Sequence, residues 1–306
     1  MNNASTLASV RLHFAGVLAS LLLLIAYPLT AMVNSRPGSV NVPGPSRSAN
    51  LSATALAQSE KPHTLAGTYY SSQGNLKASV TLSNKGLEPL EVQPTLFSMT
   101  GKRLDVPPVT VDVTSFRVFD LSEWASLGGP GFQEGSLQLF YRGKDLLLGA
   151  QIKIIDSAWS LIFDEQLSEP SLMVSSRLEG LWWRPTNTSQ VSIAISNTTD
   201  SDQTATLDMN GKTPTMERAR EMILEPHQTI LIDPTQDLPD AQTGGFESRG
   251  LSIRYSGTPG SVFARAMIQN PSTGFSSSVQ LNDPAKAKSS GLHGAGLRLG
   301  ETAGKI

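Results

Sequence analysis

The stretches LAGTYY at residues 65–70 and LEGLWW at residues 178–183 decide how this chain is organised. They lie 113 residues apart, and each ends in an aromatic doublet. At the same spacing, ASVTLSN at residues 78–84 matches VSIAISN at residues 191–197. Many collinear matches at one period are the sequence sign of an internal duplication.

Further matches follow with small changes in spacing. YRG at residues 141–143 pairs with YSG at residues 255–257 at a shift of 114, and MTGK at residues 99–102 pairs with MNGK at residues 209–212 at a shift of 110. The second copy is therefore expected to be shorter near residue 210.

Each copy carries the pattern of half-buried β-strands. Leu76, Ala78, Val80 and Leu82 alternate with polar residues, which is the period of two that a strand requires. Gly, Pro and Asn-rich turns separate the strand-like runs. Those runs are 91–97, 109–113, 116–121, 136–141, 146–155 and 160–163 in the first copy, and 204–209, 221–224, 229–232, 251–255, 262–268 and 277–281 in the second. No window after residue 60 shows a convincing helical period over three turns.

About seven or eight short strands in each copy predict an all-β fold of two tandem immunoglobulin-like β-sandwich domains. We place sandwich repeat 1 at residues 64–170 and sandwich repeat 2 at residues 176–284. The cysteine pair and intervening tryptophan of antibody domains are absent, so a fibronectin-like or other sandwich topology fits the pattern equally well.

The N-terminus predicts export. The run AGVLASLLLLIAY at residues 15–27 carries no charge and is short for a membrane span. We interpret residues 1–33 as a signal peptide or a signal-anchor helix, with an ordinary buried helix as the alternative. Residues 34–63 are rich in Ser and Pro and are predicted to be a disordered linker. The expected location is periplasmic, cell-surface or secreted, with the N-terminal helix as a membrane anchor if it is not cleaved.

The C-terminal residues 285–306 are predicted to be a disordered tail that starts a truncated third repeat. SGLHG at residues 290–294 resembles SRLEG at residues 176–180 at a shift of 114. The Gly and Ala content favours disorder over addition of a strand to a sheet edge.

Composition excludes several classes of protein. A formal net charge of −2 and a pI near 6.1 give no electrostatic basis for binding nucleic acid. Without a cysteine the chain has no disulfides, thiolate metal sites or cysteine nucleophile. We predict no cofactor and no metal.

The runs TLSN at 81–84, LEV at 90–92 and GSLQLF at 135–140 resemble the immunoglobulin-like repeats of bacterial cell-surface and adhesion-related proteins. The nearest resemblance is to uncharacterised exported proteins of soil bacteria with several such repeats. The resemblance covers about residues 64 to 300. It implies a fold, an extracellular location and an adhesive or scaffolding role, and it implies no active-site residues.

Enzyme chemistry has weak candidates in this sequence. A pair of carboxylates for glycoside hydrolysis can be drawn from Asp120, Glu123, Asp164 and Glu165. Asp164 and Glu165 end a strand-like run, so solvated charges are the favoured interpretation.

Histidine chemistry is equally weak. A catalytic triad would need His227 with Asp233, but no nucleophile elbow is present. His227 is expected in a turn, and His63 is expected in the linker. The block NTTDSD at residues 197–202 offers oxygen ligands but lacks the glycine and distal glutamate of a calcium loop, so an Asx-rich turn is expected. No catalytic residue is predicted.

The aromatic doublets are the weak candidates for ligand binding. Adjacent strand residues point to opposite faces, so one member each of Tyr69/Tyr70 and Trp182/Trp183 is expected to face outward, where it could stack on a sugar. The favoured interpretation places them in the core and in the seam between the copies.

Taken as a whole, the sequence predicts a non-catalytic exported structural or interaction protein of the cell envelope, with a role in adhesion or scaffolding. Its expected partner is a protein or a cell-surface glycan. A carbohydrate-binding module that uses Trp182 or Trp183 and a hydrolase with a dispersed carboxylate site are the alternatives.

Overall fold

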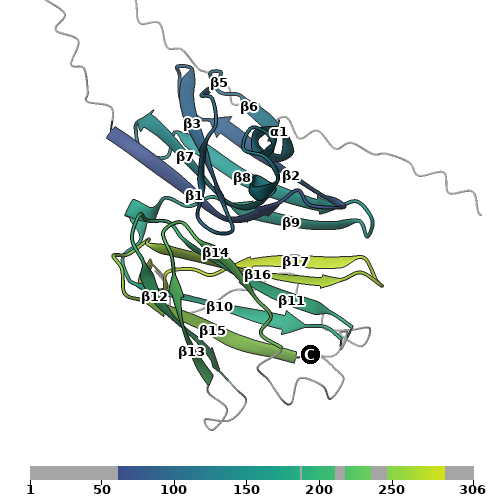
Figure 1. Cartoon of the computed structure of the whole chain (residues 1–306). Coiled ribbons are helices and arrows are strands. Elements are labelled where there is room, and N and C mark those ends of the chain that lie inside the picture. Colours follow the sequence, from purple (N-terminus) through teal and green to yellow (C-terminus); the bar gives the residue numbers. More distant parts are fainter. Residues whose placement is uncertain (1–60, 187, 211–217, 236–246, 287–306) are drawn as a thin grey trace, which may run out of the picture. The chain divides into compact units, whose positions relative to one another are not determined.

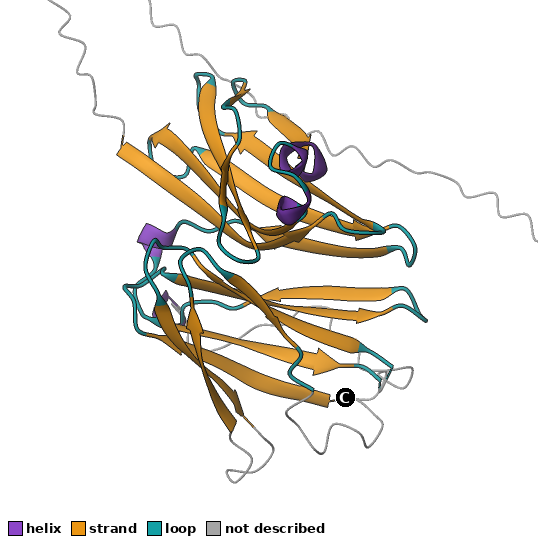
Figure 2. Ribbon diagram, viewed as in Figure 1, coloured by secondary structure: helices purple, strands orange, loops and turns teal. Residues whose placement is uncertain are grey.

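The computed structural model describes residues 61–186, 188–210, 218–235 and 247–286. Antiparallel strands dominate these residues, with a short helix and 3-10 turns between them (Figure 2). The prediction of an all-β chain is confirmed. The described strands all belong to one compact unit that runs from Ala55 onward. We call residues 61–172 the first half and residues 173–286 the second half.

Two antiparallel sheets form the first half (Figure 1). One has the order β1-β7-β3-β4, with β5 also paired to β3, and the other has the order β6-β2-β8-β9. The bounds are β1 (Lys61–Ser71), β2 (Leu76–Asn84), β3 (Leu90–Ser98), β4 (Arg103–Asp105), β5 (Val109–Val111), β6 (Phe116–Asp120), β7 (Glu134–Gly143), β8 (Leu148–Asp156) and β9 (Leu161–Gln166).

Two further antiparallel sheets form the second half, in the orders β10-β15-β12-β13 and β14-β11-β16-β17. The bounds are β10 (Arg177–Arg184), β11 (Gln190–Asn197), β12 (Gln203–Asn210), β13 (Arg218–Leu224), β14 (Thr229–Ile232), β15 (Glu247–Tyr255), β16 (Val262–Asn270) and β17 (Phe275–Gln280). Each of these strands takes the place of its counterpart in the first half, which supports the internal duplication.

Backbone dihedral angles repeat in the same way. Left-handed φ values recur at equivalent turns, at Thr114 (47°) and His227 (56°), at Leu146 (64°) and Gly260 (87°), and at Ser160 (55°) and Gly274 (67°). A positive φ is uncommon outside glycine, and the first copy carries it at Thr114, Leu146 and Ser160, so its recurrence at the three equivalent turns indicates that the turns were copied together with the strands.

The four sheets match a four-bladed β-propeller in number but differ in how the chain runs through them. A propeller blade is a separate four-stranded sheet. Here β1, β3 and β7 lie in one sheet while the intervening β2 and β6 lie in another. The chain therefore crosses back and forth between two sheets within each half.

Each half has a hydrophobic core that takes side chains from both of its sheets. Val80 and Ile152 meet Leu96 and Leu137 in the first core, and all four are fully buried. The second core is built from the equivalent strands. Alternation along β2 and β11 thus places one face of each strand in a core, as the period of two requires.

Glycine within the repeated stretch has a packing role. A Cβ on Gly180 would lie 2.9 Å from Cγ of Leu281, and one on Gly67 would lie 3.2 Å from Cγ of the equivalent Leu167. The leucine that follows the last strand of each half needs this space against the first strand.

A buried asparagine closes the second strand in both halves. The Asn84 side-chain amide donates to the carbonyls of Glu88 and Val111, at 2.7 and 3.0 Å. Asn197 donates to the equivalent carbonyls of Ser201 and Leu224, at 2.7 and 3.2 Å. The Oδ1 atom of Asn197 accepts from the Thr199 amide, so the block at residues 197–202 contains the expected Asx turn.

A carboxylate after the last strand ties each half to the start of its first strand. Glu169 Oε1 lies 2.9 Å from Nδ1 of His63 in β1. At the equivalent position, Asp283 accepts hydrogen bonds from the amides of Val174 and Ser175, at 2.6 and 2.9 Å, and from the Ser175 hydroxyl at 2.6 Å.

Two predicted boundaries need correction. The linker was predicted to extend to residue 63, but β1 begins at Lys61 and His63 is buried, because its ring bonds Glu169 and stacks on Tyr141. The tail was predicted from residue 285, but a 3-10 turn, Pro284–Lys286, continues past that point because Asp283 binds the Ala285 amide.

One short helix, α1 (Leu121–Ser126), follows β6, and its six residues agree with the expectation that no helical period extends over three turns. Asp120 caps its N-terminus through the Ser122 amide at 2.8 Å, and Leu121, Trp124 and Ala125 are buried. One helical turn is too short to show a period in the sequence.

The predictions for residues 1–60 and 287–306 lie outside the described residues. They include the signal peptide or anchor, most of the linker and the third repeat. Within the described part of the chain, no helix is long and apolar enough to cross a membrane.

The pKa of Asp283 allows a test of how much its hydrogen bonds to the segment before β10 stabilise the fold. Burial opposes its ionisation, but hydrogen bonds from Ser175, Val174 and Ala285 outweigh burial and lower the pKa of Asp283 to about 2. A lowered pKa in the folded state stabilises the fold above the ordinary pKa of 3.8 and loses that stabilisation as the pH falls towards 2. We expect Asp283→Asn to lower the unfolding free energy by about 2 kcal/mol at pH 6.

Urea unfolding of wild type and Asp283→Asn at several pH values measures this difference. The difference should shrink below pH 4. The exposed Asp202, changed to Asn, is the matched control and should change stability little. A difference between wild type and Asp283→Asn that is the same at pH 6 and pH 2.5 would contradict the assignment.

Candidate functional site: a buried contact between the two halves

A buried ion pair connects the two halves. Nη1 of Arg265 in β16 lies 2.8 Å from Oε2 of Glu165 in β9. Arg265 is 0% exposed and Glu165 is 3% exposed. Hydrogen bonds to the remaining polar atoms offset part of the cost of burying a charge pair. Among the described residues, Nε of Arg265 has no hydrogen-bond partner.

The Glu165 carboxylate also binds the backbone of β1. Oε1 accepts from the Thr68 amide at 2.6 Å, and Oε2 accepts from the Tyr69 amide at 3.3 Å. These amides are available because the pairing of β1 with β7 shifts register between Gly67 and Tyr70. A β-bulge leaves backbone groups unpaired in the ladder, and Glu165 supplies their acceptors.

The arginine side of the contact is built on the outward face of β16. Nη2 of Arg265 donates to Oγ of Ser278 in β17 at 2.8 Å. Met267 and Ala194, from the second half, belong to the hydrophobic core of the first half. Strand β16 is buried on both faces, whereas the equivalent β8 alternates between buried and exposed residues.

A second contact joins the turn after β3 to the turn before β14. The Thr229 amide donates to the Met99 carbonyl at 3.1 Å, and Thr100 bridges to Gln228. The His227 ring stacks on Phe97, with ring centroids 4.0 Å apart. Gly101 is required here, since a Cβ would lie 2.0 Å from the Pro226 carbonyl oxygen.

A third contact joins edge strands β9 and β17. The Ser276 hydroxyl accepts from the Ile162 amide and donates to the Ile162 carbonyl, both at 2.9 Å. The Gln280 amide donates to the Ser168 hydroxyl at 3.0 Å. Three separate contacts therefore hold one half against the other.

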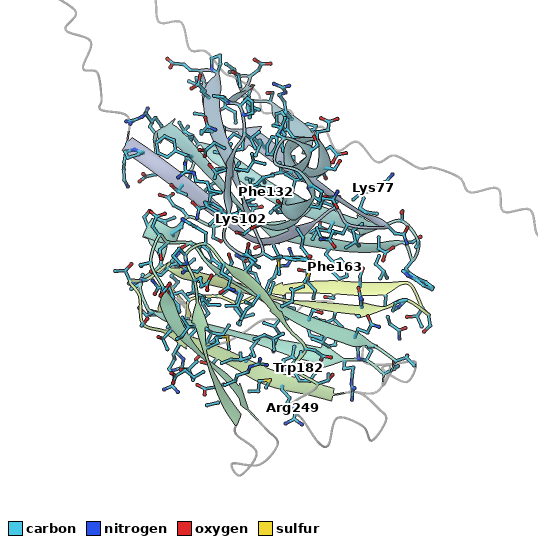
Figure 3. All side chains as sticks on the ribbon, in the orientation of Figure 1. Lys77, Lys102, Phe132, Phe163, Trp182 and Arg249 are labelled. Carbon is cyan, nitrogen blue, oxygen red and sulfur yellow. The ribbon has the colours of Figure 1, made fainter. Side chains whose placement is uncertain are left out.

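The aromatic candidates for ligand binding are mostly buried. Tyr69, Tyr70 and Trp182 are 6%, 0% and 0% exposed, and Trp183 is partly buried against the second core. Figure 3 shows Trp182 within the second half. The expectation that one member of the doublet faces outward is wrong for Tyr69/Tyr70, whereas Trp183 keeps part of its surface exposed. For Tyr69 and Tyr70 the reason is the bulge in β1, whose other face the second half covers.

The tyrosine hydroxyls are used inside the fold. Tyr69 donates to Glu134, and Tyr70 donates to the Phe132 carbonyl at 2.6 Å. Burial raises the pKa of both tyrosines well above the usual value. The exposed aromatic side chains include Phe116, at 71%, and Trp159, at 52%, which no sequence pattern singles out.

The carboxylate candidates do not come together as a pair for hydrolysis. Asp164 is exposed and lies 3.9 Å from Lys153, as a solvated charge should. The prediction that Glu165 is solvated is wrong, because the second half covers it. Asp120 caps α1 at an exposed position, and Glu123 lies in the first turn of that helix.

The histidines do not form a triad. His227 lies in a turn, as expected, and its Nε2 lies 2.7 Å from Asp200, while Asp233 binds Thr235 instead. His63 bonds Glu169, and the Ser171 hydroxyl donates to the same carboxylate rather than to the ring. A serine nucleophile needs a hydrogen bond to its base.

Residues 197–202 do not form a metal site in this structure. Across the described ranges, no group of three or more His, Cys, Asp or Glu side chains is arranged to hold a metal ion. Asp200 is engaged by His227, and Asn197 binds backbone groups.

Comparison with known proteins adds no relative. No protein-family model, curated protein or solved structure matches the chain. The contact holds strands of the two halves against each other, and its ion pair is buried from solvent.

The buried ion pair predicts very different losses of stability when two neighbouring carboxylates, Glu165 and Asp164, are changed. We expect Glu165→Gln to lower the unfolding free energy by about 3–5 kcal/mol, because it leaves the Arg265 charge buried without its partner. Asp164→Asn, the matched exposed control, should cost less than about 1 kcal/mol.

The double variant Glu165→Gln, Arg265→Met should lose less than the sum of the single variants, because the two side chains act as one pair. Chemical denaturation of wild type and of the four variants (Glu165→Gln, Asp164→Asn, Arg265→Met and the double variant) measures both effects. Equal losses for Glu165→Gln and Asp164→Asn would show that the junction does not depend on the ion pair.

Proposed function

We propose that the protein is a non-catalytic exported structural or interaction protein of the cell envelope, which displays two tandem immunoglobulin-like domains in a fixed arrangement. The observation that carries the proposal is the Glu165–Arg265 pair, which uses a buried charge from each half to join them. A protein or a cell-surface glycan is the proposed partner.

Strand order supports the immunoglobulin-like assignment in part. In an immunoglobulin sandwich, strands B and E pair in one sheet and strands C and F pair in the other. The pairs β2–β6 and β3–β7 reproduce this arrangement, and β11–β14 and β12–β15 repeat it. The outer strands differ, because β1 lies beside β7 and β8 lies beside β2, where an immunoglobulin domain has its first strand beside the second and its last beside strand F.

A fixed spacing between the halves suits a scaffold. The ion pair, the His227–Phe97 stack and the Ser276–Ile162 bonds lie on different strands of both halves. Contacts at separate points resist rotation about any one of them. Display of a binding surface at a set distance from its attachment needs this resistance.

The buried carboxylates also favour a structural role. Glu165, Glu169 and Asp283 each receive hydrogen bonds from groups of the fold. A general acid or nucleophile must reach its substrate within about 3 Å. These carboxylates instead bind backbone amides and side chains that set the position of strands.

The arrangement of the halves can be measured with spin labels. The chain has no cysteine, so Lys77→Cys and Glu221→Cys would introduce the only two thiols, at exposed sites in different halves. We expect one narrow distance distribution between the labels by electron spin resonance. Adding Glu165→Gln should broaden it, and adding Asp164→Asn should not. A broad distribution in the wild-type background would contradict the scaffold.

Export is tested separately. Fusion of residues 1–60 to a reporter that is active only outside the cytoplasm should give reporter activity, because the apolar run at 15–27 has the length of a signal-peptide core. Replacing Leu22 and Leu24 with Arg within that run is the control and should abolish the activity. A wild-type fusion that stays inactive in the cytosol would contradict export.

A further inference from the structure

Each half ties the start of its first strand to a carboxylate, but the groups that face the two carboxylates differ in chemistry. In the second half, Asp283 accepts from the amides of Val174 and Ser175 and from the Ser175 hydroxyl. None of these donors titrates near neutral pH. In the first half, the group that faces Glu169 is the imidazole of His63, which titrates in that range.

The His63 ring is enclosed by the fold. Its side chain is 0% exposed, and its ring stacks on Tyr141 with the centroids 4.9 Å apart. Burial raises the pKa of Tyr141, so the phenol is neutral where histidine titrates. Buried polar atoms are almost always hydrogen-bonded, so the protonation of the ring follows from what its two nitrogens face.

Both ring nitrogens of His63 face oxygen atoms. Nδ1 lies 2.9 Å from Oε1 of Glu169. Nε2 lies 3.2 Å from the Gly143 carbonyl oxygen and 3.5 Å from Oδ1 of Asp145. A carbonyl oxygen can only accept a hydrogen bond, so Nε2 carries a proton and donates it to Gly143.

A second proton is needed between Nδ1 of His63 and Oε1 of Glu169. A neutral ring with its proton on Nε2 would present the Nδ1 lone pair to an ionised carboxylate, and two acceptors at hydrogen-bond distance repel each other. A proton between the two atoms removes the repulsion, whether it lies nearer to Nδ1 or to Oε1. The pair then holds one proton more than a neutral imidazole beside a carboxylate, and it titrates as one unit.

Burial favours the same proton. The side chains of His63 and Glu169 are 0% and 5% exposed. A neutral imidazole beside an ionised Glu169 would leave a net negative charge in the interior, whereas the pair with its extra proton is neutral overall. The cost of burying charge and the repulsion between acceptors therefore act in the same direction.

The other charged groups near the ring do not reverse this preference. Asp145, on the turn after β7, adds negative charge beside Nε2, and Lys61 lies 3.5 Å from the same Asp145 carboxylate. Arg142 and Lys144 are exposed, and the Arg142 guanidinium lies over the Phe140 ring.

We infer that the His63–Glu169 pair is a pH-sensitive switch that holds the first residues of β1 on the fold. With the extra proton bound, Glu169 fixes His63 and, through it, residues 61–64 against β7. Loss of that proton leaves a buried lone pair facing a carboxylate and loosens this end of the strand.

The direction of the pH dependence follows from linkage. The folded pair binds a proton more tightly than a histidine of the unfolded chain, whose ordinary titration is at about pH 6.5. The stabilisation is therefore fully present below that pH and is lost as the pH rises through the range in which the folded pair releases its proton. Residues 1–60 join the fold at β1, so the switch acts where that segment begins. The inference rests on this geometry alone and does not need the proposed function.

Amide hydrogen exchange of the full chain measures the switch. We expect the protection of residues 61–66, corrected for the intrinsic exchange rate, to fall about tenfold between pH 6 and pH 8.5 in the wild type, the loss expected for one buried group left unsatisfied. Residues 174–178 are the internal control. Their protection should not change, because hydrogen bonds hold the pKa of Asp283 at about 2.

Glu169→Gln separates the switch from a merely structural contact. A glutamine amide donates a permanent hydrogen to Nδ1 in place of the titrating proton, so protection of residues 61–66 should stay near its pH 6 level at both pH values. Protection that is independent of pH in the wild type would overturn the inference. So would a fall in Glu169→Gln equal to that in the wild type, because the titrating group would then lie elsewhere.

Nuclear magnetic resonance of the wild-type histidines gives a second measurement that does not depend on the variant's folding. The His63 ring signals are assigned by their loss in His63→Gln. We expect Nε2 to carry a proton at pH 6 and the second proton to be shared between Nδ1 and Glu169. A ring at pH 6 with its only proton on Nδ1 would contradict the switch.

Discussion

The contact between the halves depends on two backbone amides that the sheet leaves unpaired. The register shift in β1 turns the amides of Thr68 and Tyr69 away from β7, and the Glu165 carboxylate accepts both. That carboxylate is then a buried charge, which would be unfavourable without a counter-ion. Arg265 of the second half supplies the counter-ion, so the bulge, the carboxylate and the arginine each require the next. The bulge in β1 therefore helps to determine how the two halves contact each other.

The ion pair occurs once, although the chain is duplicated. The position of Arg265 is occupied by Gln151 in the first half, and the position of Glu165 is occupied by Val279 in the second. Met267, which enters the first core, corresponds to Lys153 on the exposed face of β8. The two copies have therefore diverged where they meet. The first half contributes Glu165 from β9, and the second half contributes Arg265 and Met267 from β16.

Alternation and repetition predicted the all-β class, the duplication and most strands, because a period of two records which side chains face a core. They did not predict what covers the other face. Trp182 and Glu165 show this limit. Trp182 lies in the core, and its neighbour Trp183 packs against the same core. Glu165 has the sequence context of the solvated Asp164, but in the fold β16 covers it. His63 was misplaced for a related reason, as only the fold brings Glu169 to its ring. Contacts between residues about 100 positions apart leave no pattern in a single sequence.

Comparing the two copies separates what the fold needs from what the function needs. Asn84 and Asn197 make the same bonds, as do the glycine and leucine pairs at the first strands, so these positions belong to the fold. Tyr141 and Tyr255 keep the same residue and framework but differ in their partners. The Tyr255 hydroxyl donates to the Ser175 carbonyl, whereas the His63 ring of β1 stacks on Tyr141.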